Sequence, residues 1–242
     1  MFRCIVLIPS YNSGALLQKT VSAVLSVWAD IVVVIDGSTD GSGGTIEGMA
    51  AAHVGLHVLH LQHNGGKGCA VLHGAEWALQ HGYTHVLTMD ADGQHPVASV
   101  QSFIAASEHA PHAMILGMPV FGPDAPALRV WGRKLSNILV RMETRDAVAD
   151  CLFGFRVYPV RDMVAVLKAS YFMRGFDFDP EVAVRMVWRG VPTLNKPASV
   201  KYFNVAEGGI SHFHYVRDNA RLICMHLRLL VGWLWRSCCG KP

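Results

Sequence analysis

The chain opens with CIVLIPSYN at residues 4–12, an unbroken apolar run that ends in a proline and three polar residues. A strand covered on both faces needs apolar side chains on both sides, so this run is typical of a buried parallel strand. A second run, IVVVID at residues 31–36, repeats the pattern and ends in a carboxylate. Its β-branched residues favour extended backbone. The two runs indicate a parallel sheet whose polar residues collect at one edge.

Strand and helix signals alternate through the first half of the chain. Apolar runs separated by segments with helical spacing predict an α/β fold, with a mostly parallel sheet flanked by helices. The expected strands are residues 4–8, 31–35, 56–61, 85–89 and 113–118, and the expected helices are residues 15–28, 40–53, 68–80 and 96–108.

The second half is less regular, but no linker long enough to separate independent domains interrupts it. Asp179-Pro180 before an apolar stretch and Gly190 after it predict a helix capped by Asp179, because proline fits the first turn. The other expected elements are a loop at 117–126, a helix at 128–142, a strand at 150–158 and a strand pair at 193–203 around Pro197.

Composition narrows the class of protein. Hydrophobic residues make up 51% of the 242 residues and charged residues 16%, which excludes a disordered chain. The formal charge of +3 comes without a dense basic stripe, so we expect no nucleic acid partner. No apolar stretch is long enough to span a membrane, and the start does not resemble a signal peptide. Six cysteines without a Cys-x-x-Cys pair favour reduced thiols and a cytoplasmic location.

Three polar clusters follow expected strands, where ligands bind in sheets of this kind. Asp90-Ala91-Asp92 offers two carboxylates to a hard divalent cation, although such a pair can also serve a turn. Asp36 to Asp40 offers a carboxylate beside glycines, with Asp40 better explained as a helix cap. Asn64 to Gly68 is a glycine-rich loop with a lysine, a candidate phosphate cradle that lacks the P-loop spacing.

These clusters, in this order, resemble glycosyltransferase family 2, the nucleotide-sugar enzymes of the GT-A fold. The match is densest over the first hundred residues. One departure is Ile35, which stands where many relatives carry the first of two aspartates. The matching segments are IPSYN at 8–12, DGSTD at 36–40, NGGKGCA at 64–70 and DADGQHP at 90–96.

The resemblance implies a GT-A domain over residues 1–212 and a role for each matching residue. Pro9, Tyr11 and Asp36 would hold the base and ribose of the donor, with Lys67 near the nucleotide. At the catalytic centre Asp90 would hold the sugar or ribose, and Asp92 would hold Mg²⁺ or Mn²⁺ on the diphosphate.

The last of the matching segments looks most like the polyprenyl-phosphate sugar synthases. Gly154-Phe155-Arg156 strengthens that likeness and places Arg156 among the donor-binding residues. The acceptor of such enzymes is an anionic phosphate, which needs no general base.

Two carboxylates in the second half are candidates for a general base. In many members of the resembled family an acidic pair precedes an arginine and a glycine, and Asp179 falls on the base position, with Glu181 the second candidate. The alternative for Asp179 is the helix cap alone. A base would favour a hydroxyl acceptor, which is a poor nucleophile near neutral pH.

Two histidines in a late glycine-led loop are candidates for the donor site. We expect His212 to ligate the metal and His214 to meet the diphosphate, because imidazole serves either purpose. A purely structural role is the alternative for both.

Residues 213–242 are expected to form an amphipathic helix in which arginines interrupt leucines and tryptophans. Such a helix fits the bilayer interface, and core packing is the alternative. We therefore expect a protein peripheral on the inner face of the cell membrane.

The expected function is metal-dependent, inverting transfer of a sugar from a nucleotide-diphosphate sugar to a lipid-linked or hydrophobic acceptor at the membrane surface. Three alternatives stay open. They are a polyprenyl-phosphate glycosyl synthase, a nucleotidyltransferase that makes a nucleotide sugar, and a non-catalytic nucleotide-sugar binding module.

Overall fold

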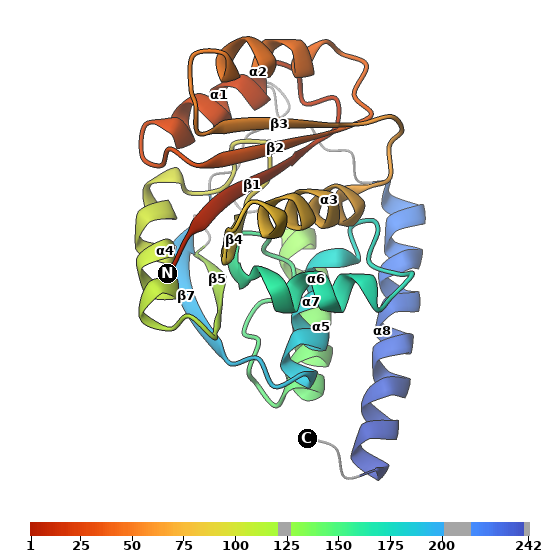
Figure 1. The fold of residues 1–242 in the computed structure, drawn as a ribbon. Coiled ribbons are helices and arrows are strands. Elements are labelled where there is room, and N and C mark those ends of the chain that lie inside the picture. Colours follow the sequence, from red (N-terminus) through yellow and green to blue (C-terminus); the bar gives the residue numbers. More distant parts are fainter. Residues whose placement is uncertain (121–126, 201–213, 240–242) are drawn as a thin grey trace.

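A computed structural model describes residues 1–120, 127–200 and 214–239, and its centre is a seven-stranded sheet with the order β3-β2-β1-β4-β6-β5-β7 (Figure 1). All strand pairs are parallel except those that β6 makes with β4 and β5. The strands are β1 (Cys4–Ser10), β2 (Ile31–Asp36), β3 (Leu56–Leu61), β4 (His85–Thr88), β5 (Met114–Val120), β6 (Arg156–Pro159) and β7 (Thr193–Ser199).

Helices cover both faces of this sheet, as the alternating pattern predicts (Figure 1). The helices are α1 (Gly14–Leu25), α2 (Ser42–Ala50), α3 (Lys67–Gln80), α4 (Val100–His109), α5 (Ala127–Thr144), α6 (Val160–Lys168), α7 (Phe178–Trp188) and α8 (Tyr215–Cys238), with a short 3₁₀ turn at Val97–Ser99.

The sheet separates two apolar cores. Side chains alternate across β1, so that Ile5 and Leu7 join the core beneath α3, α5, α6, α7 and α8. Val6 and Ile8 join the opposite core, beneath α1, α2 and α4. A strand that feeds two cores must be apolar throughout, which explains the unbroken run at the start of the chain.

The sheet reverses direction at β6, which enters between β4 and β5. The expected strand at 150–158 is shorter than predicted, because only Arg156–Pro159 pairs with a neighbour. Residues before it form the loop that carries Asp150 and Phe153. On the other side of β4, the strands β1, β2 and β4 are parallel to one another, so their carboxyl ends meet at one edge.

The expected strand pair around Pro197 is wrong where the structure describes it. Residues 193–199 form one strand, β7, which runs parallel to β5 with Pro197 opposite Met118. Proline is tolerated because β7 lies at the end of the strand order and pairs with β5 alone among the described strands. Residues 201–203 of the expected pair lie outside the described residues.

Candidate active site

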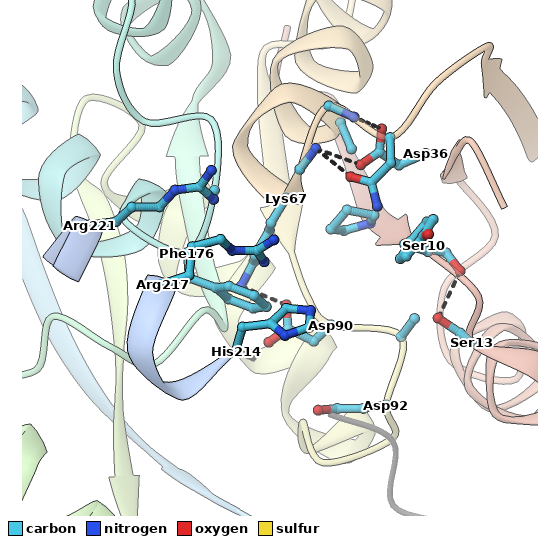
Figure 2. Close-up of a pocket in the computed structure, with 18 of the residues that line it drawn as sticks. Ser10, Ser13, Asp36, Lys67, Asp90, Asp92, Phe176, His214, Arg217 and Arg221 are labelled. Carbon is cyan, nitrogen blue, oxygen red and sulfur yellow. Dashed lines mark hydrogen bonds and ion pairs between the residues drawn. The ribbon is translucent and has the colours of Figure 1, made fainter. Parts of the chain in front are cut away.

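A cavity of about 500 Å³ opens at the carboxyl ends of β1, β2 and β4. Strand ends, the glycine-rich loop and the start of α8 enclose it, and Figure 2 shows Arg217 and Arg221 across the cavity from Asp36 and Ser10. Its lining includes Pro9, Ser10, Tyr11, Asp36, Asn64, Gly65, Gly66, Lys67, Asp90, Asp92, Phe176, His214, Arg217 and Arg221.

Asp36 ends β2 and joins it to the glycine-rich loop. Its carboxylate oxygens accept hydrogen bonds from the backbone N–H groups of Gly65 and Gly66, each at 2.8 Å. Burial raises the pKa of Asp36, and these two bonds oppose the rise. A side chain at Gly37 would meet the Asn64 nitrogen at 2.6 Å, so glycine is needed where the two loops touch.

Lys67, the first residue of α3, connects two carboxylates. Its Nζ lies 2.7 Å from Asp90 Oδ1 and 2.7 Å from Asp179 Oδ2. Burial works against the charge of Lys67, but these carboxylates outweigh burial and raise its pKa, so the ammonium stays protonated. Lys67 and Asp90, which line the cavity, are therefore joined in one ion-pair network with Asp179, which lies behind the lining.

Asp90 and Asp92 both follow β4, but their surroundings differ. The backbone N–H of Asp90 donates to His95 Nδ1 at 2.9 Å, which closes the turn between them. Burial disfavours the charge of Asp90, but Lys67 outweighs it and lowers its pKa. Burial raises the pKa of Asp92, and the charge of Asp90 adds to the rise. His95 and Lys67 oppose the rise, but neither forms an ion pair with Asp92 in the described parts of the chain.

This carboxylate pair fits a divalent cation that a diphosphate helps to hold. Burial and the neighbouring charge of Asp90 both penalise the Asp92 carboxylate, and a bound cation would relieve that penalty. Among the described residues, no three His, Cys, Asp or Glu side chains form a complete metal-binding group. Mg²⁺ and Mn²⁺ commonly use one or two carboxylates with substrate phosphates, so the set suits them.

The expected cap at Asp179 is wrong, because α7 begins at Phe178, two residues earlier than a cap at Asp179 would require, and Asp177 stands at the N-cap position. Asp179 is 5% exposed and does not line the cavity. One oxygen, Oδ2, is bonded to Lys67, whereas Oδ1 is buried without a hydrogen-bond partner among the described residues.

Glu181 also lies away from the cavity lining, and it is fully buried. Its carboxylate pairs with Arg185 on the next turn and with Arg228 of α8. The residue therefore joins α7 to α8.

Arg156 is fully buried below the cavity and does not line it. Its guanidinium donates to the carbonyl oxygens of Asp150, Phe153 and Asp179 and to the hydroxyl of Tyr158. These bonds fix the start of α7 against β6, so Arg156 supports the site from behind.

The start of α8 contributes cations that the sequence patterns do not single out. Arg217 and Arg221 line the cavity, and Asp218 between them is buried. Asp218 accepts from Arg217 Nε at 3.0 Å and from the backbone N–H of His214 at 2.8 Å. The spacing of the two arginines, four residues apart on one helix face, is the signal that could have identified them. His214 is exposed and lines the cavity, whereas His212 lies outside the described residues.

Comparison with known proteins matches residues 5–163 to Glycosyl transferase family 2. Polyprenol monophosphomannose synthase of Mycolicibacterium smegmatis is 28% identical over 215 residues, 86% of this chain and 80% of that protein. Undecaprenyl-phosphate mannosyltransferase of Micrococcus luteus is 26% identical over 217 residues, 86% of this chain and 88% of that protein.

Solved structures show the same fold. Glucosyl-3-phosphoglycerate synthase from Mycobacterium tuberculosis, with Mn²⁺, UDP-glucose and phosphoglyceric acid, has a TM-score of 0.66 at 16% identity over 100% of this chain and 81% of that chain. A mannosyltransferase from Pyrobaculum calidifontis, with GDP-Man and Mn²⁺, has a TM-score of 0.63 at 18% identity over 95% of this chain and 64% of that chain. The fold is the expected GT-A type.

Proposed function

Because this chain belongs to glycosyltransferase family 2, we propose that it transfers a hexose from a nucleoside-diphosphate sugar to a polyprenyl phosphate at a membrane surface. Membership of the family makes it a glycosyltransferase rather than a nucleotidyltransferase or a non-catalytic binding module.

The cavity supports a nucleoside-diphosphate sugar as donor. Pro9, Tyr11 and Asp36 lie together at one side and suit the base and ribose. Lys67 and Asp90 lie on the cavity floor, where hexose hydroxyls would meet a fixed ammonium and carboxylate. Arg217 and His214 face the cavity from α8 and suit the diphosphate.

Asp92 would hold Mg²⁺ or Mn²⁺ beside Asp90, and the diphosphate oxygens would complete the coordination shell. When bound, the cation would stabilise the negative charge that develops on the leaving nucleoside diphosphate. The two solved neighbours with Mn²⁺ support the choice by analogy.

The state of the two candidate bases is the observation that carries the acceptor assignment. Asp179 is held by Lys67, Glu181 is held by two arginines, and neither lines the cavity. A hydroxyl acceptor needs a carboxylate to take its proton, whereas a phosphate is already ionised. The phosphate oxygen would attack the anomeric carbon while the bond from that carbon to the diphosphate breaks, with inversion. The names of the curated relatives support the same acceptor class.

The outward side of α8 supports contact with a membrane. Met225 and Leu229 of α8 are buried in the core, so the helix packs on the protein along one side. The opposite side is apolar and exposed, and it is called here the outer stripe. It consists of Val216, Ile223, Leu227, Val231, Leu234 and Trp235, each at least half exposed.

A stripe of this kind beside arginines fits the lipid interface and supports the proposal that the enzyme is peripheral on the inner face of the cell membrane. No helix within residues 1–120, 127–200 and 214–239 has the length and apolar character needed to cross a bilayer.

A hydroxyl acceptor is the second candidate, and one observation favours it. Asp179 Oδ1 is buried without a partner among the described residues. A buried carboxylate oxygen left in that state is costly, so an acceptor hydroxyl could satisfy it.

Product identity tests the proposal. The full chain is incubated with Mn²⁺, a panel of UDP- and GDP-hexoses, and either undecaprenyl phosphate or undecaprenol in detergent, and lipids are analysed by mass spectrometry. We expect a hexosyl-phosphoprenol from the phosphate and no product from the alcohol. A hexosyl-prenol from undecaprenol, with the phosphate inert, would establish the second candidate instead.

A further inference from the structure

A second groove, of about 410 Å³, adjoins the donor cavity on the side of α8. Gly65, Gly175 and Arg221 line both, so the two spaces share a wall. None of the donor-site assignments uses the groove. Its lining is Gly65, Tyr171, Phe172, Arg174, Gly175, Asp177, Ala220, Arg221, Cys224 and Arg228.

The groove carries an excess of positive charge. Arg174 donates to the Ser170 carbonyl oxygen at 3.3 Å, and no carboxylate pairs with it within the described parts of the chain. Arg221 shares Asp218 with Arg217. In and around the groove, arginines outnumber carboxylates by five to three. The arginines are Arg174, Arg185, Arg217, Arg221 and Arg228, and the carboxylates are Asp177, Glu181 and Asp218.

One carboxylate lies in the groove itself, and its charge is already compensated. Asp177 accepts from the backbone N–H groups of Gly175 at 3.0 Å and Met173 at 3.2 Å. Arg228 lies 3.9 Å from the same carboxylate. Asp177 therefore shapes the loop, and the unbalanced cations stay available to an anion.

Aromatic side chains form the outer end of the groove. Tyr171 is 95% exposed and Phe172 is 51% exposed, although both are large and apolar in part. The guanidinium of Arg228 stacks over the Phe172 ring at 3.7 Å from its centroid, which fixes that ring. The outer stripe of α8 passes beside Cys224, because Ile223 belongs to it. A cationic inner end and an apolar outer end match a phosphate on a hydrocarbon chain.

We propose that this groove binds the acceptor, with the phosphate at Arg174 and Arg221 and the first isoprene units against Tyr171 and Phe172. The assignment rests on the proposed prenyl phosphate acceptor. Arg221, on the shared wall, would direct the acceptor phosphate toward the donor. Arg174 would determine acceptor affinity and leave donor affinity unchanged, because it lines the groove alone.

Cys224 provides a readout that does not depend on turnover. It lines the groove and is exposed, as are Cys238 and Cys239 at the end of α8 outside the groove. The full chain is alkylated with N-ethylmaleimide, and each cysteine is followed by peptide mass spectrometry. Farnesyl phosphate, inorganic phosphate and farnesol are compared as probes, without donor.

We expect farnesyl phosphate at ten times its dissociation constant to slow alkylation of Cys224 about tenfold, with Cys238 and Cys239 unaffected. Inorganic phosphate and farnesol should protect far less, because each satisfies one end of the groove. Arg174→Gln should weaken farnesyl phosphate binding about tenfold or more, since a charged hydrogen bond is lost. Arg161→Gln, at an exposed position on α6, is the matched control.

Equal reactivity of Cys224 with and without farnesyl phosphate would overturn the assignment, as would protection that survives Arg174→Gln. Protection by inorganic phosphate alone would identify a simple anion site and reject the prenyl chain. Failure of the proposed function is distinguishable from failure of this assignment. The proposed function fails if the hexose is transferred to undecaprenol, which is measured by product mass and does not involve Cys224.

Discussion

At the scale of single residues, Lys67 joins two carboxylates that come from distant parts of the chain. Its ammonium holds Asp90 and Asp179 at once, at 2.7 Å from each. One oxygen of Asp179, the residue that the sequence indicates for proton removal, is therefore already bonded to a cation.

Asp179→Asn separates the two acceptor classes. With a prenyl phosphate as acceptor, we expect kcat to fall less than about tenfold, since no proton must be removed from the acceptor. A general base would contribute about 10²–10⁴-fold, so a loss of that size with unchanged donor KM would indicate a hydroxyl acceptor. Steady-state kinetics with each acceptor measures the difference. The helix start should be unaffected, because Asp179 lies inside α7 and not at its N-cap position.

Sequence reasoning identified the side chains that follow strands and missed those whose role depends on distant partners. Pro9, Tyr11, Asp36, Lys67, Asp90 and Asp92 all line the cavity, because parallel strands bring their carboxyl ends to one edge. Glu181 forms an ion pair with Arg228, 47 residues away in the sequence, and no local pattern predicts that contact. The roles assigned to all of these residues stay predictions.

At the scale of elements, α5 carries a buried carboxyl group with no obvious partner. Glu143 is 3% exposed, and neither of its side-chain oxygens has a hydrogen-bond partner among the described residues. Burial raises its pKa from an ordinary 4.5 to about 7. Its neighbour Trp188, on α7, donates to the Glu143 carbonyl oxygen at 2.9 Å, so the group lies at a helix junction.

Glu143→Gln should remove a pH dependence of stability. Because the pKa of about 7 in the folded chain exceeds 4.5, the folded state keeps a proton that the unfolded state loses between these values. Stability therefore falls as pH rises from 4.5 to 7 and is level above that range. We expect roughly 2 kcal/mol, or about 4–8 °C in Tm, after allowance for solvent screening.

Thermal unfolding of wild type and Glu143→Gln at pH 5 and pH 8 measures this effect. The amide should leave Tm at pH 8 higher than in the wild type and nearly equal at pH 5. Equal Tm values for wild type and Glu143→Gln at pH 8 would contradict the assignment.

The outer stripe of α8 makes a second prediction for an element. Replacing Ile223 and Leu227 by serine should weaken binding to vesicles of anionic lipid by about tenfold or more per residue, because each buried apolar side chain contributes about 1.5–3 kcal/mol. Co-sedimentation measures the partition. Val54→Ser is the control, since Val54 is 97% exposed but far from α8 in the chain. Unchanged partition in the double variant would exclude the stripe as the lipid contact.

Elements of regular period were predictable, and those fixed by tertiary pairing were not. The first five strands lie within two residues of their expected bounds, because a strand between two cores must be apolar throughout. The antiparallel entry of β6 and the single strand β7 were missed, since pairing direction leaves no mark on the pattern of one segment.

At the scale of the whole molecule, the donor cavity is lined both by the parallel strands near the start of the chain and by α8 near its end. A nucleoside diphosphate with Mn²⁺ should therefore stabilise the fold. At one hundred times its Kd, the ligand adds about 2.7 kcal/mol, or about 5–10 °C in a chain of this size. Differential scanning fluorimetry with UDP or GDP, with Mn²⁺ or with EDTA, measures the shift.

Asp92→Asn in the same experiment isolates the metal. An amide is a poor ligand for a hard cation, so the part of the shift that requires Mn²⁺ should disappear. Asp146→Asn is the matched control, because Asp146 is exposed and asparagine tolerates its positive φ. A full Mn²⁺-dependent shift in the Asp92 variant would remove that residue from the metal site.

The bonds of Arg156 also bear on how freely the sequence can vary. Three of its four acceptors are main-chain carbonyls, at Asp150, Phe153 and Asp179. Every amino acid has a carbonyl at that place, so side chains at these positions can be exchanged without breaking the bonds that Arg156 makes. Arg156 itself has no such freedom, because a lysine offers one nitrogen where these acceptors need a fork. One buried cation would thus hold these segments together while leaving most of their side chains free to change.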